Sequence, residues 1–245
     1  MMFAVCCVPV SPLRAEAAHK SEMVSQLIFG EQCIVIEQKN DWAKIKCKYD
    51  DYEGWCQQSH INEIEKAKYD EQLNLLAEDW VNKIEYKHQS MMVPFGSFIN
   101  ENVINNSVKI WDINKAVINE ESIKKIAFQF LNTSYLWGGK TIFGIDCSGF
   151  SQTVFKFFGI ALMRDTWQQA SQGETIESLS AARFGDLIFF DNEAGKIMHV
   201  GILLNDRTII HASGKVRIDK IDEQGIINTD TLQRTHHLKI IKRYF

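Results

Sequence analysis

The pattern of apolar and polar residues along the chain changes in character at about residue 115. Up to about residue 66, apolar and polar positions alternate over short runs, which is typical of half-buried β-strands. Asn40-Asp41 and Asp50-Asp51 interrupt the runs as turn-forming pairs. About five short strands in so short a stretch predict a small β-barrel. The expected strands include 3–10, 32–38, 42–48 and 52–56.

The next stretch, residues 67–115, has a less regular pattern. Residues 80–86 and 107–111 read as strands, and residues 91–96, Met-Met-Val-Pro-Phe-Gly, read as a turn-rich apolar loop. The length suits a second, degenerate barrel of the same kind.

From Lys115 onward the apolar spacing becomes helical and then returns to strands. Residues 120–131 form an amphipathic pattern with acidic residues at its start, and 164–171 is a polar segment expected to be helical. Apolar strands follow at 185–190, 198–204, 208–213 and 238–244. Helices first and antiparallel strands afterwards predict an α+β domain. The expected domains are therefore 1–66, 67–115 and 116–245.

Bulk composition removes several classes of function. The chain has 245 residues, 45% of them hydrophobic and 24% charged, with a net charge of −4. This is enough for one large domain or two to three small ones. A mildly negative chain without a basic stripe gives no reason to expect a nucleic-acid partner. No apolar run approaches the ~18 residues of a membrane span, so no membrane partner is expected.

The six cysteines predict free thiols. None forms a C-x-x-C pair, which argues against a zinc ribbon. The first residues lack a basic segment, and Pro9 interrupts their apolar run early, so they make a poor signal peptide. A reduced, cytoplasmic protein is the expectation, and export through a poorly formed lipoprotein signal ending near Cys6 or Cys7 is the alternative.

Cys147 differs from the other cysteines in its position. Apolar residues at 150, 154, 157 and 158 form one helix stripe that starts just after it, and Gly159 is a plausible helix stop. The unpaired N–H groups at a helix N-terminus favour a thiolate over a thiol. Asp146 opposes this effect by like-charge repulsion. Cys147 is therefore a candidate nucleophile, although a buried structural cysteine is the commoner case.

Two histidines strengthen that hypothesis. His199 and His211 lie in strands joined by an evident hairpin turn, and a register symmetric about Asn205 would set them directly opposite each other. Cross-strand partners have Cβ atoms about 4.5–5.5 Å apart, so one imidazole can orient the other. Nucleophile, base and orienting group is the arrangement of a thiol hydrolase. The remaining histidines are assigned structural or surface places: His19, His60, His88, His236 and His237.

A zinc site built from Cys147, His199 and His211 is the competing chemical interpretation. No fourth ligand suggests itself, so this alternative ranks well below the thiol hydrolase, and neither a metal nor another cofactor is predicted.

Five motifs in order resemble the NlpC/P60 cysteine peptidases and cover about residues 116–245. They are Tyr-Leu-Trp-Gly-Gly at 135–139, Asp-Cys-Ser-Gly-Phe at 146–150, Gly-Asp-Leu-Ile-Phe-Phe at 185–190, Met-His-Val-Gly-Ile at 198–202 and Ile-His-Ala-Ser-Gly at 210–214. The N-terminal region resembles a bacterial SH3-like domain through Gly30-Glu31, Asp41-Trp42 and Gly54-Trp55. The resemblance implies a papain-like α+β domain, with helices packed on an antiparallel sheet, preceded by one or two SH3-like barrels.

The resemblance also implies roles for individual residues. By position, Cys147 is the nucleophile, His199 the base and His211 the third polar residue that orients the base. In the related subgroup, the first SH3-like domain limits the pocket to peptides with a free N-terminal L-Ala, and Tyr52 and Glu22 resemble its capping residues. A carboxylate, Asp146 or Glu22, would hold the substrate ammonium. The implied pocket residues are Tyr135, Trp137, Asp146, Ser148 and Asp165.

The chain as a whole resembles γ-D-glutamyl-L-diamino acid endopeptidases. The expected reaction is hydrolysis of the γ-D-Glu–L-diamino acid bond in murein peptides, in cell-wall peptide recycling, with either lysine or diaminopimelate as the diamino acid. A CHAP-like peptidoglycan amidase and a non-catalytic wall-binding protein are the alternatives. The spacing of the histidines argues against the amidase, and the complete set of Cys147, His199 and His211 argues against an inert domain.

Overall fold

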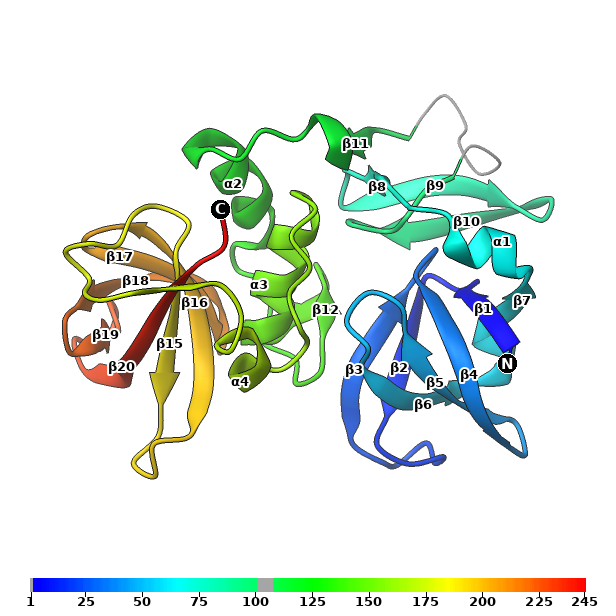
Figure 1. The fold of residues 1–245 in the computed structure, drawn as a ribbon, viewed down its shortest axis with the longest axis horizontal. Helices are drawn as coiled ribbons and strands as arrows, with labels where there is room; N and C mark the ends of the chain where they lie inside the picture. Colours follow the sequence, from blue (N-terminus) through cyan, green and yellow to red (C-terminus); the bar gives the residue numbers. More distant parts are fainter. Residues whose placement is uncertain (1, 101–107) are drawn as a thin grey trace. The chain divides into compact units, whose positions relative to one another are not determined.

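The computed structural model describes residues 2–100 and 108–245, which divide into two compact units (Figure 1). The first unit contains Met1–Ala116 and also the segment Trp137–Ile142. The second contains Val117–Leu136 and Phe143–Phe245. The segment 137–142, which the sequence places with the peptidase part, is thus grouped with the first unit. The limits 1–66, 67–115 and 116–245 stay predictions.

Seven short antiparallel strands form the barrel of the first unit. The turns predicted at Asn40 and Asp51 are present, and both residues have positive φ angles, 53° and 57°. Strands β2, β3 and β7 were not predicted, because their mixed polar pattern hides the alternation. The expected strand 3–10 covers most of β1 and the bend after it, and reaches only the first residue of β2. The strands are β1 (Met2–Cys6), β2 (Val10–Arg14), β3 (Met23–Ile28), β4 (Gln32–Lys39), β5 (Trp42–Cys47), β6 (Glu53–Gln57) and β7 (Ile61–Ile64), in the sheet order β3-β2-β6-β5-β4-β1-β7.

The alternating apolar positions of these strands meet inside the barrel. Small and branched side chains fill it, and four of the six cysteines are among them, all free thiols. Removing this apolar surface from water stabilises the barrel by about 25 cal/mol per Å². The buried cluster consists of Ala4, Cys6, Leu13, Leu27, Cys33, Ala43, Ile45, Cys47, Cys56 and Ile61.

The rest of the first unit contains a β-hairpin that corrects one prediction. Residues 89–94 pair with residues 81–86, so most of the expected apolar loop 91–96 is a strand. Lys87 and His88, both with positive φ, form its two-residue turn and lack the Asn-Gly signature that would have revealed it. Ser107, where another strand was expected to start, lies outside the described residues. The elements are α1 (Lys66–Asp70), β8 (Leu75–Ala77), β9 (Val81–Tyr86), β10 (Gln89–Pro94) and β11 (Ile110–Asp112), followed by the short strand β12 (Lys140–Thr141).

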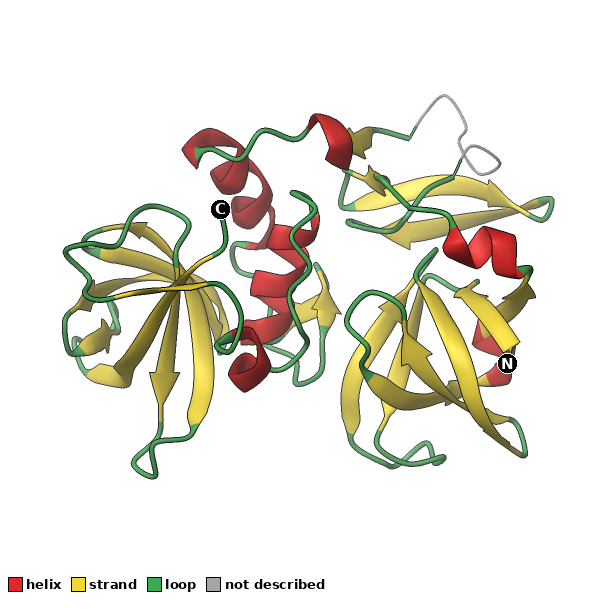
Figure 2. Cartoon of the chain, in the orientation of Figure 1, coloured by secondary structure: helices red, strands yellow, loops and turns green. Residues whose placement is uncertain are grey.

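The second unit is built on a second seven-stranded antiparallel sheet (Figure 2). An additional pairing between β19 and β20 closes most of this sheet on itself. Strand therefore outweighs helix in a domain expected to be α+β. The strands are β13 (Gly144–Ile145), β14 (Glu174–Ile176), β15 (Leu187–Asp191), β16 (Ile197–Asn205), β17 (Thr208–Ser213), β18 (Lys215–Asp222), β19 (Gly225–Ile227) and β20 (Arg234–Arg243), of which β14 to β20 form the sheet in the order β14-β20-β15-β16-β17-β18-β19.

Helices of the second unit lie beside this sheet (Figures 1 and 2). The helix α3 (Cys147–Lys156) packs against β16 and β17, and its predicted apolar stripe is buried. Gly159, with φ of 70°, lies just beyond its end as expected. The other helices are α2 (Glu120–Ala127), capped by Asn119, and α4 (Thr166–Gln169). Within the described part of the chain, no helix has the length and apolar character needed to cross a membrane.

Candidate active site

Cys147 is the first residue of α3. The side chain of Asp146 caps the helix by accepting a hydrogen bond from the N–H of Gly149 at 2.7 Å. The thiol is 5% exposed and receives hydrogen bonds from the backbone N–H groups of Val200 and Ser148. Because Val200 follows His199 on β16, packing of α3 on this strand brings the nucleophile candidate beside the base candidate.

The protonation state of Cys147 differs from the expected thiolate. Burial, followed by the charge of Asp146, raises the pKa of the thiol to about 12. The N–H groups of Val200 and Ser148 and the cation of Arg164 oppose this change without reversing it. The nucleophile is therefore a neutral thiol that needs a base.

His199 and His211 form a hydrogen-bonded pair, although not in the predicted register. The Nε2 atom of His199 lies 2.8 Å from Nδ1 of His211. His211 pairs with Gly201, and the register shifts between Leu203 and Asn205, so the two histidines are diagonal rather than directly opposite. A shift of two residues keeps both side chains on the same face of the sheet, and that is why they still meet.

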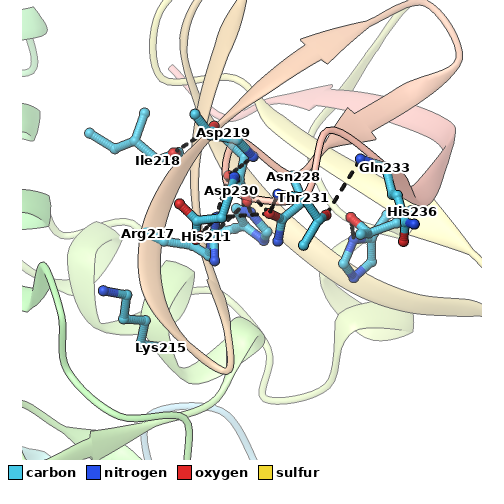
Figure 3. A network of polar contacts seen from close by, with 12 residues as sticks. His211, Lys215, Arg217, Ile218, Asp219, Asn228, Asp230, Thr231, Gln233 and His236 are labelled. Carbon is cyan, nitrogen blue, oxygen red and sulfur yellow. Dashed lines mark hydrogen bonds and ion pairs between the residues drawn. The ribbon is translucent and has the colours of Figure 1, made fainter.

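Asp219 on β18 extends this pair. Its Oδ2 lies 3.0 Å from Nε2 of His211, and Arg217 binds the same carboxylate at 2.7 Å (Figure 3). Burial alone would raise the pKa of Asp219, but hydrogen bonds from His211, Arg217 and Thr229 hold it well below its usual range. The group is an ionised carboxylate buried behind the histidines.

The ionised carboxylate fixes the tautomers of both histidines. A carboxylate only accepts hydrogen bonds, so Nε2 of His211 must carry a proton and its Nδ1 must be the acceptor. His199 then donates from Nε2, which leaves its Nδ1 with a free lone pair. Burial, followed by the charges of His211 and His236, lowers the pKa of His199 well below its usual value. His199 is therefore a neutral imidazole suited to accept the thiol proton.

Sequence reasoning missed Asp219, because β18 was not predicted as a strand. Its segment Lys-Val-Arg-Ile-Asp alternates in period two, and this pattern could have placed Arg217 and Asp219 on one face of a strand next to β17. His236, which was assigned a structural place, also lies at the site: its ring stacks on that of His199 with centroids 4.2 Å apart.

Asp146 lies in a buried ion pair that the sequence did not reveal. Arg164 binds both of its carboxylate oxygens, at 3.0 and 2.6 Å, and also donates to Oγ of Ser148 at 2.9 Å. Arg164 is among the largest fully buried side chains. Such bidentate pairing satisfies the charge of Asp146 inside the protein. Asp146 and Ser148, on either side of Cys147, thus both bond to the Arg164 guanidinium, and their role in a substrate pocket stays a prediction.

Two further predicted pocket residues belong to the second unit. Tyr135 pairs with Ile145, two residues before Cys147. Burial, with the charges of Cys147 and Asp146, raises the pKa of its hydroxyl, so this group stays a hydrogen-bond donor. Asp165 caps α4 in a capping box with Gln168. A structural role therefore accounts for Asp165, and a pocket role for it stays a prediction.

The other predicted pocket residues belong to the first unit. The indole Nε1 of Trp137 donates to Oε1 of Glu22 at 2.6 Å, so two residues 115 positions apart in the chain do meet. Tyr52 packs against the apolar interior of the barrel. The roles of Tyr52 and Glu22 in capping the pocket stay predictions.

Among the residues that the structure describes, no cluster of His, Cys, Asp and Glu side chains is arranged to hold a metal ion. Three of the four ring nitrogens of His199 and His211 take part in hydrogen bonds with each other or with Asp219, and the fourth, Nδ1 of His199, is the one that can accept a thiol proton. The arrangement can instead deprotonate a thiol and orient the base that does so.

Comparisons with known proteins agree with this geometry. Residues 132–235 match the NlpC/P60 family, and residues 13–61 match the bacterial dipeptidyl-peptidase SH3 domain. A gamma-D-glutamyl-L-lysine dipeptidyl-peptidase of Bacillus cereus is 26% identical over 84% of this chain and 73% of its own length. The Bacillus subtilis protein of the same name is 42% identical over 38% of this chain and 31% of its own length.

A solved NlpC/P60 family protein from Bacillus cereus has the same fold. It superposes with a TM-score of 0.80, at 19% identity, over 99% of both chains. The predicted resemblance, the SH3-like N-terminal region and the NlpC/P60 fold are thereby confirmed. The chain carries a bacterial SH3 domain, followed in the sequence by an NlpC/P60 cysteine peptidase domain.

Proposed function

We propose that the protein hydrolyses peptidoglycan peptides by a cysteine mechanism. The observation that carries this proposal is the line of hydrogen bonds from Asp219 through His211 to His199, beside a thiol at the start of α3. Names of the relatives support the substrate class, since two of them are gamma-D-glutamyl-L-lysine dipeptidyl-peptidases.

In the proposed mechanism, Nδ1 of His199 takes the thiol proton as Sγ of Cys147 attacks the γ-carbonyl carbon of D-Glu. Backbone N–H groups at the start of α3 stabilise the oxyanion that forms. The imidazolium then gives its proton to the leaving amine, the γ-amide bond breaks, and a thioester remains on Cys147. Water, deprotonated by His199, hydrolyses the thioester and restores the thiol. Hydrogen bonds from His211 and Asp219 stabilise the transient imidazolium.

The finer substrate is L-Ala-γ-D-Glu-L-diamino acid with a free N-terminal amine, met as free peptide in the cytoplasm during wall recycling. Glu22 is exposed and can hold an ammonium, although it also accepts the Trp137 indole N–H. Asp146 is the weaker candidate for this role, because Arg164 already pairs with it. Recognition of the amine therefore rests chiefly on the resemblance, with Glu22 and Tyr52 as the residues to substitute.

The direct test is a mass-spectrometric assay of the purified full chain on L-Ala-γ-D-Glu-L-Lys and on the diaminopimelate peptide. We expect release of L-Ala-D-Glu by the wild type and none by Cys147→Ala. The faster of the two peptides identifies the preferred diamino acid.

Two controls sharpen this assay. If the enzyme recognises the free N-terminal amine of its substrate, an N-acetylated peptide should be cut far more slowly. Glu22→Gln should raise KM for the free peptide and leave KM for the acetylated peptide unchanged. Failure to cut either free peptide would contradict the proposed substrate. Release of an intact stem peptide from N-acetylmuramoyl substrates would instead identify the amidase alternative.

A further inference from the structure

His236 on β20 lies against the catalytic pair without bonding to it. Its ring is stacked on that of His199, with centroids 4.2 Å apart and an interplanar angle of 27°. Parallel rings at this spacing present faces to each other, so no N–H of one ring points at a nitrogen of the other. The recorded hydrogen-bond partner of His236 is the neighbouring Thr235 hydroxyl, at 2.9 Å from Nδ1.

The rings around His199 enclose it on several sides. His211 meets it edge to face at 5.0 Å, Phe190 lies at 5.8 Å, and His236 covers one face. Phe190 and His211 also contact His236 edge to face, both at 5.8 Å. His199 is 7% exposed, whereas His236 is only half-buried. His236 is thus the outer ring of this cluster.

Burial, with the titratable groups that face it, keeps His236 neutral at ordinary pH. The pKa of His236 is lowered to about 4, chiefly by burial and then by His211 on β17, and His237 on its own strand acts in the same direction. Asp219 on β18 opposes them. The ring that covers His199 is consequently an uncharged aromatic face.

We propose that His236 is a positioning residue for the general base: its neutral ring holds the His199 imidazole in place and shields one face of it from water. The ring acts through its shape and its π-face rather than through its nitrogens. The flat π-face of His236 can accommodate the imidazolium that His199 becomes during each turnover. Bulk water in place of His236 would leave the His199 ring free to rotate.

The test compares His236→Ala, His236→Phe and the wild type, with His237→Ala as a matched control on the same strand. Because the choice of peptide rests on the proposed function, a substrate-free readout accompanies turnover. This readout is long-range ¹H–¹⁵N NMR of the imidazole nitrogens, which reports the tautomer and the titration of His199 directly.

His236→Ala should lower kcat about two- to tenfold with little change in KM, in keeping with the loss of one aromatic stacking contact. Its His199 should titrate at higher pH than in the wild type, because water enters, and the acid limb of the pH profile should move up with it. His236→Phe should restore kcat, the titration and the single tautomer. His237→Ala should behave as the wild type does.

Three outcomes would overturn the inference: an alanine variant with unchanged kcat and His199 titration, a phenylalanine variant as impaired as the alanine one, or an equal loss in His237→Ala. Thermal melts of each variant identify any that fail to fold, and the NMR comparison of the folded phenylalanine variant then decides. Should the peptide prove to be the wrong substrate, the wild type shows no turnover at all, while the NMR shifts still distinguish the variants.

Discussion

Cys47 in the N-terminal barrel and Cys147 in the peptidase unit are equally buried, each with 5% of its surface exposed. Burial is the largest cause of a raised pKa in both thiols. Cys47 sits mid-sheet on β5, and the charged groups that act on it are Asp50, Lys140 and Glu31. Cys147 begins a helix and receives the N–H of Val200, next to His199. The two thiols are thus equally buried but have different partners. The neighbouring groups, rather than burial, make Cys147 the candidate nucleophile.

The largest expected effect separates these two cysteines. Cys147→Ala should reduce kcat/KM by about 10⁴-fold or more, because no other group replaces the nucleophile. Cys47→Ala should leave kcat/KM unchanged and lower the free energy of unfolding by about 1 kcal/mol, since it only leaves a small gap in the barrel. Peptide turnover and urea unfolding of both variants check this. A similar loss of activity in the Cys147→Ala and Cys47→Ala variants would contradict the assignment of different roles to the two cysteines.

The second effect concerns the base. His199→Gln keeps the size and polarity of the side chain but cannot accept a proton, so kcat should fall about 10³-fold or more. His60, which lies in the first unit and accepts or donates to Ser11 at 2.9 Å, provides the control. His60→Gln should retain wild-type turnover, and a comparable loss there would show that the histidine effect is not specific to the site.

A smaller effect should follow from the residue that sequence reasoning missed. Asp219→Asn removes the charge that fixes the tautomer of His211, and we expect a loss of about 10²-fold in kcat with KM nearly unchanged. Asp222 lies on the same strand as Asp219 and also binds an arginine, Arg234 of β20, at 2.7 Å, but its carboxylate is more exposed. Asp222→Asn is therefore the matched control, expected to be near wild type. Equal activities in the two variants would remove Asp219 from the site.

The smallest effect is on stability as the pH changes. The folded-state pKa of His199 lies below the ordinary value, so below about pH 6.5 the unfolded chain binds a proton that the folded chain does not. The contribution of neutral His199 to the free energy of unfolding should therefore be fully present above this pH and be lost as the pH decreases. The slope per such group is at most about 1.4 kcal/mol per pH unit. His199→Gln should flatten it, which denaturant titrations between pH 7 and 5 can measure. An unchanged slope would contradict a buried neutral His199.

The sequence predicted those features that depend on short-range patterns. The stripe of α3, the helix stop at Gly159 and the turns at Asn40 and Asp51 all follow from local spacing and backbone preferences. Cys147, His199 and His211 could be proposed as a catalytic set because their residue types and the flanking strand patterns can be read along the chain.

Features that depend on pairing between strands were harder to predict. The hairpin turns at Asp206–Arg207 rather than about Asn205, and with the irregularity between Leu203 and Asn205 this pairs His211 with Gly201 instead of His199. Closure of the sheet by β19 and β20 depends on partners about ten residues apart and brings His236 to the site. Arg164 and Asp219 become informative only once their partners are known, because charged residues in a sequence are normally read as surface groups.

The most direct test of the central claim is competitive alkylation of the folded protein with iodoacetamide at substoichiometric amounts, resolved by peptide mass mapping. The account predicts that Cys147 is modified well before Cys47, that loss of turnover follows Cys147 modification one to one, and that His199→Gln slows Cys147 towards the rate of Cys47. Equal modification of the two cysteines in the wild type, or a Cys147 rate that does not depend on His199, would contradict the claim that partners rather than burial make this thiol the nucleophile.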